Sequence, residues 1–250
     1  RSIRVIDGAV MVMCGVGGVE PQTESVWNLA NHEKLARLIY INKLDRVGSD
    51  FERVVDEIRD RLTARATPIQ IPIGGEDTFR GMVDLLSEQA LVWDGTQDAY
   101  VVEPVPTDMI EAVSAAREAL VDRICETDDT LLMQRLEGEL PEQGALKAAL
   151  RNATIAGEIV PVLCGVSKRR IGIQPLLDAV VDYLPSPQDV EVVKGSKPGE
   201  EHTIVERPST FDAPFCASAF KIMVDPYVGH LTWVRVFSGK LSAGESIYNP

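Results

Sequence analysis

The sequence predicts an α/β protein in which a parallel sheet with helices carries an α+β insert and is followed by part of an antiparallel β-barrel. A pattern of apolar strand, polar loop and amphipathic helix occurs three times. A long acidic segment with a periodicity of its own separates the second occurrence from the third. A stretch rich in Pro, Gly and Ser then precedes alternating segments rich in Val, Phe and Trp, which are typical of antiparallel strands.

The first strand–loop–helix unit opens with the apolar run 9–14, which is followed by Gly15, Gly17 and Gly18. A continuous apolar run of this kind predicts a strand buried on both faces. Pro21 comes next, and because proline is tolerated in a first helical turn, we expect a helix to begin there.

The second and third units have the same order. The run 38–41 ends at polar Asn42 and the run 159–164 ends in a tight turn, and each is followed by apolar residues at helical spacing. These are Phe51, Val54, Val55, Ile58 and Leu62 in the second unit, and Ile173, Leu176, Leu177, Val180, Val181 and Leu184 in the third. The repetition predicts one parallel sheet formed by residues 1–62 and 159–185.

Residues 63–158 are expected to form an α+β insert with a distinct charge. They contain 18 acidic and 7 basic residues, so this segment carries −11 of the chain's net charge of −13. Short runs at 68–73, 81–85 and 90–93 indicate a small antiparallel element. Two helical faces are expected after it, formed by Met109, Val113, Ala116, Leu120 and Ile124, and by Leu146, Ala149, Leu150 and Ala153. The acidity fits either an ordinary solvated surface or a module that faces a protein partner and avoids RNA phosphate.

The last part of the chain changes composition twice. Residues 186–210 are rich in Pro, Gly, Ser, Lys and Glu, and we expect a linker there. Beyond it, the alternating runs 215–224 and 231–237 predict that residues 211–250 form the start of a small β-barrel.

The motif Asn42-Lys43-Leu44-Asp45 is the strongest chemical signal in the sequence. It stands where a parallel strand ends, which is the edge at which such sheets bind ligands. A carboxylate can accept hydrogen bonds from both N1–H and the exocyclic amine of guanine, whereas adenine offers no such pair and would leave the charge unpaired. We therefore expect Asp45 to select guanine, Asn42 to tie the loop to its neighbours, and the Lys43 stem to lie along the base. The alternative is an ordinary polar loop in which the aspartate caps the next helix.

A second loop, Gly165-Val166-Ser167-Lys168, follows the next parallel strand. Backbone N–H groups in such a turn can bind the guanine carbonyl, and Lys168 can cover the face of the base. Taken alone, these residues are more typical of a plain surface turn.

The motifs that organise phosphates are missing. The sequence contains no G-x-x-x-x-G-K-[ST] motif, and none of His32, His202 and His230 follows a DxxG element. Without a glycine cradle, its lysine and a Mg²⁺-holding hydroxyl, nothing organises phosphoryl transfer. We therefore expect no catalytic residue and no metal ligand in this chain, and no hydrolysis by this chain alone.

Composition excludes several other classes. The four cysteines form no CxxC pair, so they predict small buried apolar residues and neither a zinc site nor disulfides. No apolar run approaches the roughly 18 to 20 residues that cross a bilayer, so we expect a soluble cytoplasmic protein without membrane contact. The net charge of −13 argues against a simple nucleic-acid binder.

Longer segments resemble the elongation factor G family of bacterial translational GTPases. The matching segments are DGA at the first strand, GVGGVEPQTESVW, NKLDR, PIQIPIG, FRGMVDLL, PVLCG, GIQPLLDAVVDYLPSP and FKIMVDPYVGHLTWVRVFSG. They cover almost the whole chain in the family's order and spacing. The resemblance implies an internal fragment containing the second half of a P-loop-type GTPase domain, its insert, and the opening of the second domain.

The resemblance also implies ligands and partners. It implies binding of GTP or GDP, with Mg²⁺ held by residues absent here, and a monomer that acts on the ribosome and touches the ribosomal stalk protein through the insert. By position, Asn42, Lys43 and Asp45 match the guanine motif. Val166 stands where the family usually has Ser, and Ser167 where it usually has Ala, which removes a hydroxyl from the base loop but leaves its backbone donors.

Three functions remain open at this point. The first is a ribosomal translocase that couples GTP binding and hydrolysis to movement of tRNA and mRNA. The second is a ribosome-protection or release-factor relative with the same GTPase domain. The third is a non-enzymatic interaction module that uses the acidic insert.

Overall fold

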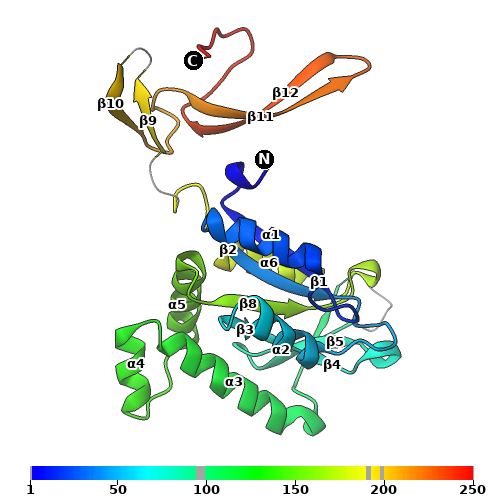
Figure 1. The fold of residues 1–250 in the computed structure, drawn as a ribbon. Helices are drawn as coiled ribbons and strands as arrows, with labels where there is room; N and C mark the ends of the chain where they lie inside the picture. The colour runs from blue at the N-terminus through cyan, green and yellow to red at the C-terminus, as the bar shows by residue number, and fades with distance from the viewer. Residues whose placement is uncertain (1, 94–98, 190–192, 198–199, 250) are drawn as a thin grey trace. The chain divides into compact units, whose positions relative to one another are not determined.

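The computed structural model describes residues 2–93, 99–189, 193–197 and 200–249. The chain divides into two compact units, one formed by Gly8–Leu184 and the other by residues 1–7 together with 185–250 (Figure 1). Each unit has its own sheets.

A parallel sheet forms the centre of the larger unit. Its strands are β1 (Gly8–Cys14), β2 (Ala36–Asn42), β8 (Val160–Cys164) and β3 (Ala66–Pro68), in the spatial order β1-β2-β8-β3. Cys14 is in register with Asn42, and Ile41 with Cys164, so the carboxyl ends of three strands lie at one edge. The predicted parallel sheet is therefore confirmed.

The prediction that the first strand is buried on both faces was wrong. Val12 is 62% exposed, and within β1 only Met13 is buried. Among the described residues β1 pairs with β2 alone, so it is an edge strand. The interior strand β8, in contrast, is buried at every position.

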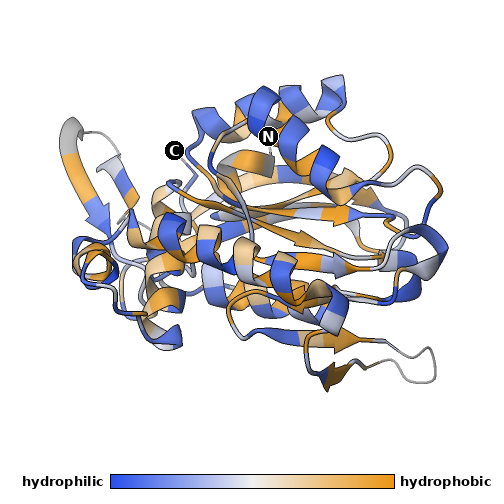
Figure 2. Cartoon of the chain, turned by 90° about the horizontal axis from the view of Figure 1, so that it is seen from below, coloured by the Kyte–Doolittle hydropathy of each residue, from blue (hydrophilic) through white to orange (hydrophobic). Residues whose placement is uncertain are grey.

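Helices cover both faces of this sheet. They are α1 (Pro21–His32), α2 (Phe51–Arg61), α5 (Gln143–Ala156) and α6 (Ile173–Tyr183). Alternate residues of β2 point to opposite faces. Ile39 and Ile41 join a buried cluster with residues of α1 and α2, whereas Leu38 and Tyr40 join one with residues of α5 and α6. Hydrophilic residues occupy much of the outward surface of the helices (Figure 2), although Leu177 and Val181 of α6 are 59% and 77% exposed.

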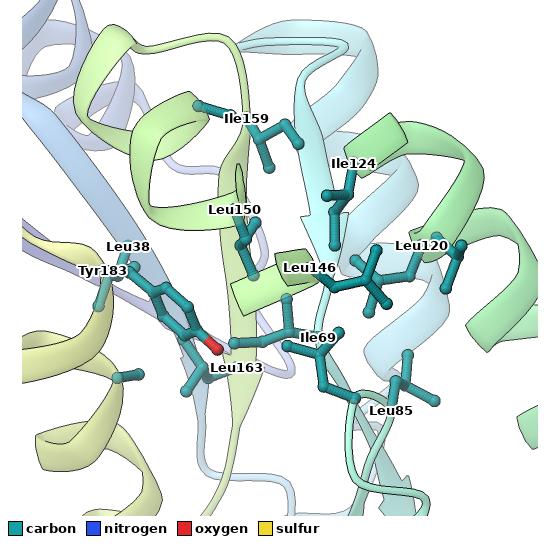
Figure 3. Close-up of a cluster of buried hydrophobic side chains, with 14 of the residues drawn as sticks. Leu38, Ile69, Leu85, Leu120, Ile124, Leu146, Leu150, Ile159, Leu163 and Tyr183 are labelled. Atoms are coloured by element: carbon teal, nitrogen blue, oxygen red, sulfur yellow. The ribbon is translucent and has the colours of Figure 1, made fainter. Parts of the chain in front are cut away.

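The second of these clusters links the sheet to the insert. Leu146 and Leu150 of α5 lie close to Leu163 of β8, Ile69 and Tyr183 (Figure 3). Leu146 and Leu150 are fully buried. Close packing here makes the insert and the parallel sheet share one core, which agrees with their assignment to a single compact unit.

The insert contains a four-stranded antiparallel sheet and two further helices. These are β4 (Gln70–Ile73), β5 (Gly81–Asp84), β6 (Gln89–Val92), β7 (Val101–Glu103), α3 (Ile110–Cys125) and α4 (Asp129–Leu136). The expected strands are confirmed, and so are the two expected helices, which are α3 and α5, but the run 68–73 is divided. Residues 66–68 form β3, which pairs with β8 in the parallel sheet although it lies within 63–158.

Two elements of the insert had no signal in the sequence. Strand β7 is exposed at all three positions, so it shows no alternation of apolar and polar residues. Helix α4 has eight residues and buries only Leu131, and it begins because the Asp128 carboxylate accepts hydrogen bonds from the N–H groups of Thr130 and Leu131.

The smaller unit consists of two antiparallel hairpins. They pair β9 (Val193–Lys197) with β10 (Glu200–Arg207), and β11 (Cys216–Asp225) with β12 (Gly229–Ser238). The strands expected at 215–224 and 231–237 are confirmed. The stretch 186–210, which was expected as a linker, contains β9 and β10, whose polar sequence includes β-branched Thr203, Ile204 and Val205.

Contacts with the chain's amino-terminal segment complete the smaller unit. The segment includes the short helix η1 (Ser2–Val5), and Arg235 of β12 donates to the Val5 carbonyl at 2.6 Å and pairs with the Asp7 carboxylate. Within the described residues, no helix of either unit is long and apolar enough to cross a membrane.

We predict that Leu150→Ala lowers the free energy of unfolding by about 2 to 5 kcal/mol, because it removes a fully buried side chain from a close-packed cluster. The matched control is Leu136→Ala, also in a helix, where the side chain is 74% exposed and the change should stay within about 0.5 kcal/mol. Urea denaturation followed by circular dichroism measures both. If both variants lowered the free energy of unfolding equally, the close packing around Leu150 would be contradicted.

Candidate functional site

Two loops at the carboxyl edge of the parallel sheet are joined by one side chain, Asn42. Its Nδ2 donates to the Ser167 hydroxyl at 2.9 Å, and its Oδ1 accepts from the Ser167 N–H at 3.0 Å. The same Oδ1 accepts from the Lys43 N–H at 2.8 Å. The amide therefore closes both loops onto one another, as expected from its place at the end of β2.

Asp45 lies in the first loop with its carboxylate unengaged. Its side chain is partly buried, and the hydrogen bonds and ion pairs of the described residues include none to this carboxylate. The alternative in which it caps the next helix does not hold, because Asp50 caps α2 by accepting from the Arg53 N–H at 3.0 Å. A half-buried carboxylate with both oxygens free is suited to accept from a ligand.

The residues on either side of Asp45 are firmly held. Leu44 is 3% exposed and packs in the cluster with α2, and its carbonyl accepts from the Ser49 hydroxyl at 2.8 Å. Lys43 has a positive φ of 66°, which is rare for a residue with a side chain, and it is exposed. Its stem is therefore free to lie along a flat ligand.

The second loop differs from expectation in where its hydroxyl lies. Val166 is 1% exposed and packs in the core, so its side chain faces away from the surface. Ser167, one residue later, supplies the hydroxyl that Asn42 binds. The departure from the family pattern thus moves a hydroxyl by one residue in this loop.

Most backbone donors of the second loop already have partners. The N–H groups of Gly165, Val166 and Ser167 donate to Ile41 O, Ile171 O and Asn42 Oδ1. The hydrogen bonds of the described residues include none from the Lys168 N–H. Lys168 is exposed and therefore presents both a backbone donor and an ammonium group at this edge.

Tyr40 and Gly165 shape the second loop, and the sequence reasoning missed both roles. The Tyr40 hydroxyl donates to the Ile171 carbonyl at 3.1 Å from a buried position. A Cβ on Gly165 would lie 2.3 Å from that hydroxyl and 2.5 Å from the carbonyl, so glycine is required for this close approach. The only indication of these roles in the sequence was that Tyr40 interrupts the otherwise aliphatic run 38–41.

A third loop, which follows β1, lies beside the first. The Gly15 N–H donates to the Asn42 carbonyl at 2.8 Å, and Arg53 of α2 donates to the carbonyls of Gly15 and Val16 at 3.1 and 2.8 Å. The loop is thereby fixed from both sides.

Cys14 ends β1 at this same edge and is only partly buried, whereas a buried apolar residue was expected. Partial burial raises the pKa of its thiol, but the N–H groups of Gly17 and Val16, with Lys43 and Arg46 nearby, outweigh burial and lower the pKa below its ordinary value of 9.0. Burial without such donors raises the pKa of Cys164. Cys125 and Cys164 are buried as predicted, whereas Cys14 and Cys216 are only partly buried.

The arrangement is suited to hold a flat, polar, hydrogen-bonding group. It offers free carboxylate acceptors, a backbone donor and two lysine stems at one sheet edge. In the part of the chain that the structure describes, no group of three or more His, Cys, Asp or Glu side chains could hold a metal ion.

Comparison with protein-family models gives one match over this region. Residues 1–186 match the model described as the elongation factor Tu GTP binding domain. The chain belongs to this family. Its members are translational GTPases that bind guanine nucleotides.

A solved structure shows the same fold. The chain resembles a protein of Thermus thermophilus, known from its crystal structure, with a TM-score of 0.80 and 27% sequence identity. The match covers 98% of this chain but only 34% of the Thermus protein. The parallel sheet with helices, followed by antiparallel sheets, is thus an arrangement found in a considerably longer protein.

We predict that Cys14 reacts with iodoacetamide faster than Cys164 at pH 7.5, because the thiolate is the nucleophile and only the Cys14 pKa is lowered. The labelling rate at Cys14 should rise with pH and then level off. The midpoint of this rise should lie below 9.0, the ordinary pKa of a cysteine thiol. Peptide mass spectrometry after timed labelling measures both sites. A midpoint above 9.0 at Cys14 would contradict the donor arrangement at the end of β1.

Proposed function

We propose that this chain is the base-recognising part of a ribosomal translocase of the elongation factor G type. The whole protein would couple GTP binding and hydrolysis to movement of tRNA and mRNA on the ribosome in the cytoplasm. The observation that supports this most is the unengaged carboxylate of Asp45. It lies in the first of the two loops that Asn42 joins by hydrogen bonds.

In this proposal each residue of the edge has a separate task. Asp45 accepts from N1–H and the exocyclic amine of guanine, and Lys43 and Lys168 cover the base. The Lys168 N–H is the described donor left for the guanine carbonyl, while Ser167 and Val166 shape the turn. A site of this kind rejects adenine because the carboxylate would be left unpaired.

Hydrolysis requires parts of the protein that this chain does not contain. We propose that residues 1–250 alone do not hydrolyse GTP, since the sequence supplies no glycine cradle and no residue to position an attacking water. Mg²⁺ would neutralise phosphate charge when bound to the whole protein. The contribution of this chain is to select and orient the nucleotide through its base.

A ribosome-protection or release-factor relative remains the nearest alternative. Such proteins would use the same base site, so the site does not separate them. The length of the insert, residues 63–158, favours the translocase.

We predict that Asp45→Asn in the whole protein weakens GDP binding by about 100-fold or more and improves binding of xanthosine diphosphate. The amide replaces an acceptor with a donor, which suits the additional carbonyl of xanthine and not the amine of guanine. Competition between the two nucleotides against a fluorescent GDP analogue measures the exchange of preference.

The matched control for this test is Asp50→Asn, which lies five residues away and caps α2. It should leave the preference for guanine unchanged, because its carboxylate is engaged by a backbone N–H. The proposal fails if Asp45→Asn loses guanine and xanthine nucleotides equally while remaining folded, or if the unaltered protein binds neither.

We also propose that the insert contacts the ribosomal stalk protein. The insert carries a net charge of −11, so contact with an acidic partner would have to rest on apolar surface. The structure offers such surface at the end of α4 and just beyond it, where Met133, Leu136 and Leu140 are 57%, 74% and 61% exposed.

We predict that the stalk protein binds this chain with a dissociation constant at or below about 100 μM, equivalent to roughly 5.5 kcal/mol. Met133→Glu combined with Leu136→Glu should abolish binding, whereas Val47→Glu, at an exposed position outside the insert, should not. Calorimetric titration of residues 1–250 measures all three. Absence of binding at 100 μM by the unaltered chain would count against this partner.

A further inference from the structure

The tip of the hairpin between β4 and β5 contacts the loop that carries Asp45. The Glu76 N–H donates to the Leu44 carbonyl at 2.8 Å, and the Glu76 Oε1 accepts from the Gly48 N–H at 2.6 Å. The contact comes from the insert, whereas the loop belongs to the parallel sheet. One residue therefore binds the loop through both its backbone and its side chain.

These two hydrogen bonds lie on either side of Asp45. Leu44 is the residue before it, and Gly48 comes three residues after it. Asp45 makes no hydrogen bond of its own to the described residues, so its position depends on how its neighbours are held. Ser49 assists at Leu44, but the described bond to the Gly48 N–H comes from Glu76 alone.

Glu76 holds this position in a strained backbone conformation. Its φ is +53°, in the left-handed region that residues with a side chain rarely adopt. Gly74, with φ +76°, and Thr78 stabilise the turn, since the Thr78 hydroxyl donates to the Gly75 carbonyl at 2.7 Å. The conformation of Glu76 is therefore held both by the hydrogen bonds of the turn and by its contact with the loop that carries Asp45.

The same hairpin also reaches the second base loop. Arg169, one residue after Lys168, donates from Nη1 to the Phe79 carbonyl at 3.4 Å. Phe79 is 1% exposed and anchors the hairpin in the core beside Leu44. The hairpin tip thus contacts both loops that Asn42 joins.

We propose that Glu76 is a positioning residue that holds Asp45 in the orientation needed for guanine and makes base affinity depend on the state of the insert. This inference rests on the proposed function, because it assumes that the loop binds a guanine base. Glu76 does not touch the ligand in this proposal. Its effect passes through Leu44 and Gly48.

The coupling has a direction that follows from the geometry. If the hairpin tip moves away, the Gly48 N–H loses its acceptor and residues 45–48 gain freedom, which the nucleotide must remove on binding. Nucleotide binding, in turn, should stabilise the hairpin tip by the same factor, since coupling between two sites is reciprocal.

The test compares variants of the whole protein. Glu76→Ala removes the acceptor and should raise the dissociation rate of fluorescent GDP by about tenfold, as expected for loss of a hydrogen bond to a charged group. Glu76→Gln retains an Oε1 acceptor and should stay within about threefold of the unaltered protein. Asp77→Ala is the matched control, because it removes the same charge from the exposed neighbouring position.

Two further measurements separate positioning from general loss of stability. Hydrogen exchange of residues 74–79 should slow when GDP is added to the unaltered protein, and this effect should be lost in Glu76→Ala. The melting temperature without nucleotide, compared between Glu76→Ala and Asp77→Ala, shows whether either variant unfolds.

The outcomes distinguish this inference from the proposed function. If the unaltered protein does not bind GDP, the proposed function fails. If it binds GDP, and Glu76→Ala dissociates at the rate of the unaltered protein or of Asp77→Ala, the inference about Glu76 is wrong. An equal effect of Glu76→Gln and Glu76→Ala would also overturn it, because the acceptor would then be irrelevant.

Discussion

The bridge made by the Asn42 side chain is the interaction on which the candidate site depends. A primary amide is suited to this role because it can donate and accept at the same time. Here it binds the hydroxyl and the N–H of Ser167 from the end of β2. Parallel pairing of β2 with β8 brings the two loops to the same edge, and the amide then fixes the distance between them.

The surrounding structure restricts each loop further. Leu44 packs inward between two polar neighbours, and Val166 packs inward in the other loop. Burial of one apolar residue in each loop leaves the polar residues beside it at the surface. The polar groups at the sheet edge are therefore held by buried apolar residues. The close contact between Tyr40 and Gly165 adds to this support below the second loop.

The sequence was sufficient for the architecture of the parallel unit and for the prediction that two polar loops meet at one edge of its sheet. Long apolar runs and helical spacing predicted β2, β8 and α2, because these elements bury their apolar residues. The spacing also predicted α6, but Leu177 and Val181 of its expected apolar face are 59% and 77% exposed. The same reasoning failed for β1, since an apolar run has the same appearance in an edge strand as in an interior one. It also failed for β9 and β10, where charged residues interrupt the alternation.

The finer features of the site depend on tertiary contacts and could not be predicted. Nothing local in the sequence connects Glu76 with Leu44, because the two residues meet only when the hairpin returns to the sheet. The lowered pKa of Cys14 likewise follows from how the loop after β1 turns back over the thiol. The role of Ser167 required knowing that Val166 faces inward.

The position of β3 has a consequence for how the acidic insert joins the protein. The chain leaves the parallel sheet through β3 and returns through β8, and these two strands are direct neighbours, with Ala66 opposite Val160. The entropic cost of bringing the two ends of such a segment together grows only slowly with its length, by about 0.6 kcal/mol for each doubling. The length of the acidic insert therefore adds little to the entropic cost of forming the β3–β8 pair, which sets where the insert leaves and rejoins the parallel sheet.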